Sequence, residues 1–240
     1  MDSFITMNEV SQSFNGEDVL TSINLEINEG EIYGLLGPSG SGKTTLVKTI
    51  VGTLKPSSGT VYVQDVEMPS LKKLQDIGYM AQADALYSEL TAKENLAFFA
   101  KLYGIPRHSI SNRIDEVLSQ VDLLESKNKL ADKFSGGMKR RLSLAIALLH
   151  KPKILILDEP TVGIDPILRN KVWNHFYEMK QQGISIIITT HVMDEAEKCD
   201  QLALLRDGKI MASGSPSKLK KQTNTSSIEQ SFLYYGGVQT

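Results

Sequence analysis

The 240-residue sequence contains a single cysteine, Cys199. One cysteine cannot form an internal disulfide, so we expect a reducing compartment and a buried, structural thiol. Basic and acidic residues nearly balance, 26 against 28, and the net charge is −2. A chain without a basic excess is not typical of nucleic-acid-binding proteins, and we expect no nucleic-acid partner.

The sequence also lacks a long apolar run. Its most apolar stretches, residues 142–149 and 185–189, are far shorter than the roughly 20 residues that cross a bilayer. The first ten residues contain no basic region followed by an apolar run, so we expect no signal peptide. A role at a membrane would therefore require a separate chain that carries the spans.

What is present is a patterned chain with 41% apolar residues, enough for a substantial core. Apolar alternation around the turn signal at 15–18 predicts an antiparallel strand pair at 3–10 and 19–27. A second hairpin is predicted where residues 206–208 separate two apolar segments. Buried strands are predicted for residues 31–37, 59–63, 152–160 and 184–190, and helices for residues 43–54, 91–105, 109–124, 138–149 and 166–181.

Strands and helices alternate at both ends of the chain, and the middle is helical. This order predicts an α/β core with a small antiparallel sheet and an inserted helical subdomain at 91–147. The core would span residues 3–90 and 148–214, so that the domain covers residues 3–214. Residues 215–240 are predicted as a polar linker and a short tail, in which residues 228–235 form a docking helix.

A glycine-rich loop between a predicted strand and a predicted helix carries the chemistry. The segment GPSGSGKTT matches G-x-x-x-x-G-K-[ST], in which glycines let backbone N–H groups approach phosphate oxygens. Its members are Gly37, Pro38, Ser39, Gly40, Ser41, Gly42, Lys43, Thr44 and Thr45. Lys43 would reach the terminal phosphates, and the Thr44 hydroxyl suits Mg²⁺. The loop predicts a P-loop NTPase core.

Two acids stand near the end of the buried strand predicted at 152–160. Asp158 is expected to hold Mg²⁺, and Glu159 to polarise an attacking water from the opposite side of the strand or from the turn after it. A GTPase is disfavoured because no stretch fits N-K-x-D or D-x-x-G. A small-molecule kinase leaves unexplained a second corner suited to phosphate, residues 133–141.

That second corner, KFSGGMKRR, resembles the signature of the ABC ATPases, and the other motifs of that family occur in the same order. Gln82 matches its Q-loop, Asp165 its D-loop and His191 its switch histidine. The resemblance covers roughly residues 3–214. It implies that Gln82 ligates Mg²⁺ and orients water, that His191 contacts the γ-phosphate, and that Phe14 stacks on adenine. A core role for Phe14 is an equal alternative.

The resemblance further implies an ATP-dependent dimer, of this chain with itself or with a homologous ATPase. Ser135, Gly136 and Gly137 would then bind the partner's nucleotide, whereas Ser135 taken alone is a plain helix cap. Phe134, Met138 and Gly163 depart from the usual motif residues. Because Gly163 replaces a common serine, the contacts of the D-loop across the dimer are an open point.

Residues 83–105 resemble those of bacterial drug and antibiotic export ATPases. The implied function is ATP hydrolysis that powers a separate permease, with the chain peripheral at the cytoplasmic face of the membrane and the permease docked near 83–104. The alternative is a soluble ABC ATPase acting on DNA or the ribosome. That alternative is disfavoured because the loop-to-signature interval is short and without heptads, and because the chain has one ATPase unit. A non-catalytic signalling subunit is disfavoured because the catalytic residues are all present.

Overall fold

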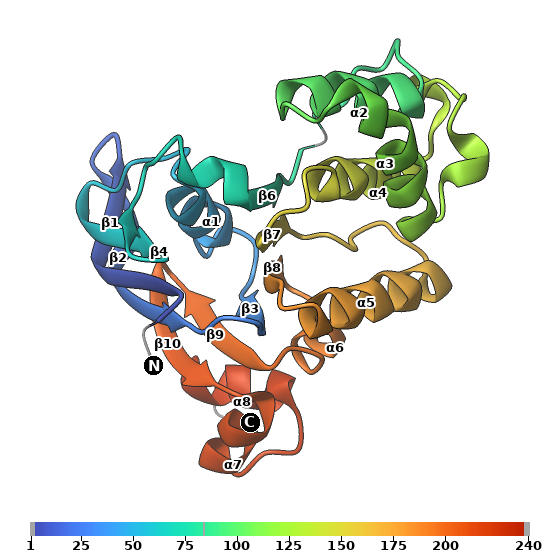
Figure 1. Cartoon of the computed structure of the whole chain (residues 1–240). Helices are drawn as coiled ribbons and strands as arrows, with labels where there is room; N and C mark the ends of the chain where they lie inside the picture. The colour runs from blue at the N-terminus through green and yellow to red at the C-terminus, as the bar shows by residue number, and fades with distance from the viewer. Residues whose placement is uncertain (1–2, 84, 238–240) are drawn as a thin grey trace. The chain divides into compact units, whose positions relative to one another are not determined.

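The computed structural model describes residues 3–83 and 85–237. The described chain falls into two compact units. The first combines the residues up to Lys73 with those from Ser185 onward, and the second is Leu74–Ile184. In Figure 1 the first unit therefore joins the blue N-terminal part of the chain to its red C-terminal part.

The first unit contains an antiparallel sheet in the order β2-β1-β4-β5. Its strands are β1 (Ile5–Phe14), β2 (Glu17–Ile27), β4 (Ser58–Val63) and β5 (Val66–Glu67). In β1 the side chains of Ile5 and Met7 are buried on one face, which is the alternation expected of a half-covered sheet. The antiparallel pair predicted for residues 3–10 and 19–27 is confirmed.

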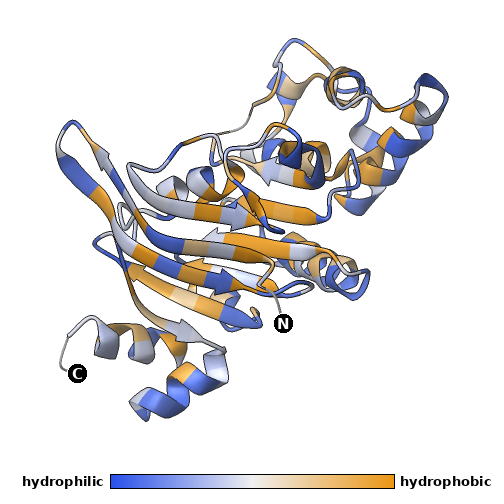
Figure 2. Cartoon of the chain, turned by 60° about the vertical axis from the view of Figure 1, so that its left-hand side comes forward, coloured by the Kyte–Doolittle hydropathy of each residue, from blue (hydrophilic) through white to orange (hydrophobic). Residues whose placement is uncertain are grey.

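Parallel strands form the second layer of the same unit. β3 (Ile32–Leu36) pairs in parallel with β8 (Ser185–Thr190) and with β9 (Gln201–Arg206), and β9 forms the predicted hairpin with β10 (Lys209–Gly214). All residues of β3 and β8 are buried, as expected for parallel strands covered on both faces. Hydrophobic residues recur along the strands in Figure 2.

Helix α1 (Lys43–Val51) follows β3 and contacts β2, β4 and β8. The short helix α6 (Met193–Ala196) follows β8. Near the C-terminus, α7 (Pro216–Thr223) packs on α8 (Ile228–Tyr235). The helix predicted at 228–235 is confirmed.

The prediction of a polar linker across 215–227 is wrong where α7 forms. The Ser215 hydroxyl caps this helix by accepting from the Lys218 N–H at 3.2 Å, and Pro216 occupies its first turn. Leu219 is fully buried and anchors the helix. A capped start and one apolar anchor are enough to order a segment whose other residues are mostly polar.

Among its described residues, the second unit holds two parallel strands, β6 (Ile77–Met80) and β7 (Ile154–Asp158), and four α-helices. The helices are α2 (Ala92–Leu102), α3 (Arg107–Gln120), α4 (Gly136–Leu148) and α5 (Pro166–Gln181). Short 3₁₀ turns occur at Lys73–Asp76, Leu124–Ser126 and Ala131–Lys133. Helices α2, α3 and α4 contact one another and lie together in Figure 1.

Helix α2 begins with a capping box formed by Thr91 and Glu94. The Thr91 hydroxyl accepts from the Glu94 N–H at 3.2 Å, and the Thr91 N–H donates to the Glu94 carboxylate at 2.8 Å. This reciprocal capping box satisfies two N–H groups of the helix start. The second unit is larger than the helical subdomain predicted for residues 91–147, because it also includes β6, β7 and α5. In the described part of the chain, no helix combines the length and the apolar character needed to cross a bilayer.

Candidate nucleotide-binding site

At some positions of the loop at residues 37–45, the backbone leaves room only for glycine. Gly42 has φ 101°, in the left-handed region. A Cβ on Gly37 would lie 2.2 Å from the Leu205 carbonyl oxygen, and one on Gly42 would lie 2.8 Å from the Leu20 side chain. The Ser41 N–H donates to the Pro38 carbonyl at 3.2 Å, which closes the loop on itself.

Helix α1 starts directly after this loop. Its N-cap is Gly42, which has no side chain to occupy the free N–H groups of the first turn. Such a helix start attracts anions, because its N–H groups and its dipole both favour negative charge. Lys43 is 5% exposed, and its ammonium donates to the carbonyls of Gly37 at 2.8 Å and Pro38 at 2.9 Å. A cation is therefore fixed beside the loop.

The segment that carries His191 is tied to the same loop. Leu36 and Thr190 are paired in the parallel strands β3 and β8, so Gly37 and His191 each follow a paired residue. The Gly37 N–H donates to the Thr190 carbonyl at 3.3 Å. His191 is exposed at the strand end. The structure thus brings the predicted switch histidine to the edge of the sheet from which the phosphate loop emerges.

Sequence reasoning missed the residues that shape this strand end. The Thr190 hydroxyl donates to the buried Glu195 carboxylate at 2.7 Å and accepts from the Val192 N–H at 2.9 Å. These two bonds bracket His191. The apolar run ending in two threonines and followed by acids was the available signal. Phe14, at the end of β1, is 44% exposed, so the alternative core role for Phe14 is wrong.

In the second unit, β7 ends at Asp158, which is fully buried. Glu159 follows in a bend with φ 53°, so it lies in the turn after the strand and not on the strand's opposite side. The Gln82 side-chain amide donates to the Glu159 carboxylate at 3.4 Å. Gln82 comes two residues after Met80, which pairs with Leu157 of β7. The structure therefore brings these two predicted residues together within this unit.

The negative charge of Asp158 affects the pKa of Tyr79, its neighbour on β6. Burial, and then the negative charge of Asp158, raise the pKa of Tyr79 to about 12. The phenol therefore stays protonated at physiological pH. Tyr79 pairs with Ile156, two residues before the acid, which explains the proximity.

The signature segment forms the start of α4. The Ser135 hydroxyl accepts from the Met138 N–H at 3.3 Å, so the plain capping role is observed. Ser135 and Gly136 are exposed, and a Cβ on Gly136 would meet nothing within 4 Å. Packing within this chain therefore does not require glycine at 136.

Asp165 caps α5 in a similar way. Its carboxylate accepts from the N–H groups of Ile167 at 3.1 Å and Leu168 at 3.0 Å. Asp165 is also exposed, and Pro166 occupies the first turn of the helix. The predicted D-loop residue is thus fixed by a local bond while remaining accessible.

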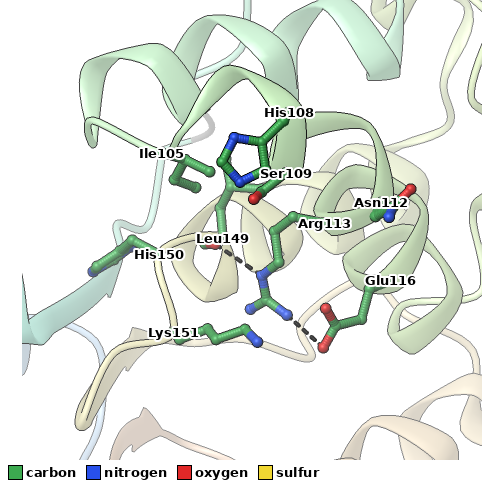
Figure 3. A pocket seen from close by; sticks show the side chains of 9 residues that line it. All are labelled: Ile105, His108, Ser109, Asn112, Arg113, Glu116, Leu149, His150 and Lys151. Carbon is green, nitrogen blue, oxygen red and sulfur yellow. Dashed lines mark hydrogen bonds and ion pairs between the residues drawn. The ribbon is translucent and has the colours of Figure 1, made fainter.

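A cavity of about 470 Å³ lies elsewhere in the second unit, and none of its nine lining residues belongs to the motifs (Figure 3). Arg113 in its wall donates to the Leu149 carbonyl at 2.8 Å and pairs with Glu116 at 2.6 Å. The guanidinium is therefore engaged by the protein. His108 and His150 both line this cavity, and His150 is half-buried.

A buried parallel strand, a glycine-built loop and an uncapped helix start define the class of phosphate-loop nucleotide-binding proteins. Within that class, the ABC transporter family matches residues 20–162. The chain belongs to the ABC transporter family. The resemblance stated from the sequence motifs is confirmed.

Two curated relatives illustrate the similarity. The chain is 38% identical over 239 residues to the probable multidrug ABC transporter ATP-binding protein YbhF of Escherichia coli (strain K12), covering 97% of this chain and 41% of that protein. It is 37% identical over 235 residues to the linearmycin resistance ATP-binding protein LnrL of Bacillus subtilis (strain 168), covering 93% of this chain and 76% of that protein. The chain thus spans about two fifths of the first relative's length.

Solved structures agree with the predicted fold class. An ATP-binding subunit of an ABC transporter superposes with a TM-score of 0.89 at 26% identity, covering 98% of this chain and all of the other. The cassette MJ0796, a dimer in a post-hydrolysis state bound to ADP and Pi, superposes with a TM-score of 0.82 at 27% identity, covering 88% of this chain and 98% of the other. The α/β fold with an antiparallel sheet and an inserted helical part is confirmed.

Proposed function

We propose that this chain binds ATP with Mg²⁺ and hydrolyses it to power a separate membrane permease that exports its substrate. The observation that carries hydrolysis is the bond of Gln82 to Glu159, directly after a fully buried strand. A carboxylate held at a strand end with an amide beside it suits the activation of water. The names of the relatives favour a transporter over a soluble ATPase acting on DNA or the ribosome.

The phosphates would bind the loop at residues 37–45. Backbone N–H groups of Ser39, Gly40 and Ser41 and of the α1 start would cradle the oxygens, and Thr45 would add a hydroxyl. Lys43 would exchange its two carbonyl partners for the terminal phosphates, because a phosphate is a stronger acceptor for an ammonium than a neutral carbonyl. Phe14 would stack on adenine, which its exposure supports.

Three residues would hold Mg²⁺: Thr44, Gln82 and Asp158. Their hydroxyl, amide and carboxylate oxygens are the donors that Mg²⁺ prefers, so the set fits the ion chemically. Bound there, the ion would neutralise charge on the phosphates. Glu159 would accept a proton from the attacking water, and Gln82 would orient that water. His191 would contact the γ-phosphate.

We further propose that two ATPase chains close on ATP as a dimer, either two copies of this chain or this chain and a homologue. Ser135, Gly136, Gly137 and Asp165 would meet the partner's nucleotide. The exposure of the first two and the open space at Gly136 support this, since a local cap alone needs neither. A dimeric relative bound to ADP and Pi provides a precedent.

The permease would dock on α2, and the chain would be peripheral at the cytoplasmic face of the membrane. Helix α2 and the segment before it expose an aromatic and aliphatic patch. Tyr87 and Phe98 are each about two fifths exposed with ring centroids 4.8 Å apart, and Leu102 is 70% exposed. An exposed apolar patch of this kind is typical of an interaction surface.

The catalytic assignment is tested by Glu159→Gln. The variant keeps the side-chain shape but loses the base, so we expect steady-state ATP hydrolysis to fall by about 100-fold or more while ATP binding stays within about threefold of the wild type. Hydrolysis is measured by phosphate release, and binding by a fluorescent ATP analogue. Asp132→Asn, an exposed acid outside the motifs, is the control and should leave both unchanged. Full hydrolysis by Glu159→Gln would remove Glu159 from the mechanism.

A further inference from the structure

Arg140 lies in the second turn of α4, and its side chain is buried, with 7% of the residue exposed. In the sequence, Arg140 is one basic residue of the helix predicted at 138–149. In the structure its guanidinium donates to backbone carbonyls of the segment that carries Gln82. Nη1 donates to the Ala81 carbonyl at 2.9 Å and to the Gln82 carbonyl at 2.8 Å.

The other edge of the same guanidinium reaches the end of β7. Nη2 donates to the carbonyls of Asp158 and Glu159, the second at 2.8 Å, and Nε donates to the Glu159 carbonyl at 3.2 Å. One planar group thus joins four carbonyls from two segments that are far apart in sequence. Lysine cannot reproduce this arrangement, because its donors radiate from a single nitrogen.

These bonds act on the backbone bend at Glu159. Glu159 has a left-handed backbone, which costs a non-glycine residue energy unless its surroundings hold it there. Its carbonyl also accepts a longer bond, 3.4 Å, from the Val162 N–H. The two shorter bonds from Arg140 fix the peptide that orients the Glu159 side chain toward Gln82.

We propose that Arg140 is a positioning residue for ATP hydrolysis: it fixes Gln82 and Glu159 relative to each other by clamping the backbone of both segments. The inference rests on the proposed ATPase function and deepens it. Nucleotide affinity should depend little on Arg140, because the phosphate loop lies in other residues. The turnover rate should depend on it strongly, because small displacements of catalytic groups are costly.

The chain offers a matched control outside the motifs. Arg113, on α3, is 9% exposed, and its guanidinium donates to the carbonyls of Leu148 and Leu149, the second at 2.8 Å. It makes the same kind of contact to the C-terminal end of α4, which carries none of the motif residues. Arg140→Lys and Arg113→Lys therefore both weaken a buried arginine anchor, and only the first weakens the proposed clamp.

Two measurements on the full chain test the proposal. Without nucleotide, we expect the amide of Val162 to exchange hydrogen about tenfold faster in Arg140→Lys, because the bend at Glu159 opens more often. With ATP, we expect kcat to fall by about 10- to 100-fold and KM to change by less than about twofold. Arg113→Lys should match the wild type in both measurements at a comparable melting temperature. Arg140→Gln provides the same comparison if the lysine variant does not fold.

Unchanged exchange and kcat in Arg140→Lys would overturn the proposal. Equal losses in Arg113→Lys would also overturn it, because they would reduce Arg140 to a general packing role. A wild type that binds but does not hydrolyse ATP would refute the proposed function instead. In that case the exchange comparison still decides whether Arg140 holds the two segments.

Discussion

At the scale of single residues, His150 shows how burial sets a protonation state. Its ring stacks on Tyr103 at 4.2 Å, and its Nε2 lies 3.1 Å from the Ile77 carbonyl. Because a carbonyl only accepts, Nε2 is the donor. Burial lowers the pKa of His150 below its ordinary value. The neutral ring is therefore the form that fits the folded chain.

This predicts a loss of stability in acid. The unfolded chain binds a proton at His150 more readily than the folded chain, so the free energy of unfolding should fall as the pH drops through about 6.5. His150→Phe keeps the stacked ring and removes the titration, so its stability should fall less between pH 7 and pH 5. Urea unfolding at the two pH values measures the difference. Equal falls in the two proteins would show that His150 titrates in the folded chain as it does in the unfolded chain.

The residue scale is also where sequence reasoning reached its limit. The apolar run before Asp158 and Glu159 identifies these two acids from the sequence, but the sequence alone allows two placements of Glu159. Its conformation depends on Arg140, which is distant in sequence and donates to carbonyls. Nearly every residue has such a backbone carbonyl, so a contact to one cannot be recognised from the residue types in the sequence.

At the scale of elements, most helices and strands follow from periodicity. Helix α5 covers residues 166–181 as predicted, since Asp165 and Pro166 provide a start signal that needs no tertiary contact. Helix α7 was missed, although Ser215 and Pro216 carry the same kind of signal, because its exposed lysines outnumber its apolar anchor. The prediction of a linker gave the polar composition more weight than the capping signal. In the folded chain, the burial of Leu219 stabilises the helix despite that composition.

The pair α7 and α8 is held by a cluster of hydroxyls that can be tested. Ser231 is fully buried, and its Oγ lies 3.0 Å from the Thr223 hydroxyl and 2.7 Å from the Thr225 hydroxyl. Ser231→Ala should lower the free energy of unfolding by about 1 kcal/mol, because buried hydroxyls lose a partner. Ser226→Ala removes an exposed hydroxyl from the same region and should stay within about 0.5 kcal/mol of the wild type. Identical denaturation curves for all three proteins would show that the cluster contributes nothing.

At the scale of the whole molecule, the helix starts at Gly42 and at Ser135 are both suited to phosphate. One ATP needs a single such loop. The proposed dimer resolves this, because each nucleotide would then meet the loop of one chain and the signature of the other. Arg140 connects the signature to the proposed catalytic residues, because the helix that starts at Ser135 also holds the backbone of Gln82 and Glu159.

Two inactive variants can test whether the signature acts on the partner's nucleotide. Ser135→Arg places a bulky cation where the partner's γ-phosphate would close, and Lys43→Ala removes the loop cation. In a mixed dimer, one composite site combines the intact loop of the first with the intact signature of the second. We therefore expect the mixture to recover part of the ATP hydrolysis, or ATP-driven dimerisation if both sites must act together.

Ser135→Ala is the control, because it loses the bond from the Met138 N–H without adding bulk or charge. We expect it to cost about 1 kcal/mol of stability, the usual loss for a helix cap, and to retain far more hydrolysis than Ser135→Arg. If subunits exchange and the mixture recovers neither hydrolysis nor dimerisation, the signature does not act across a dimer. Ser135 would then be the local cap of α4 and nothing more, and the open space at Gly136 would need another explanation.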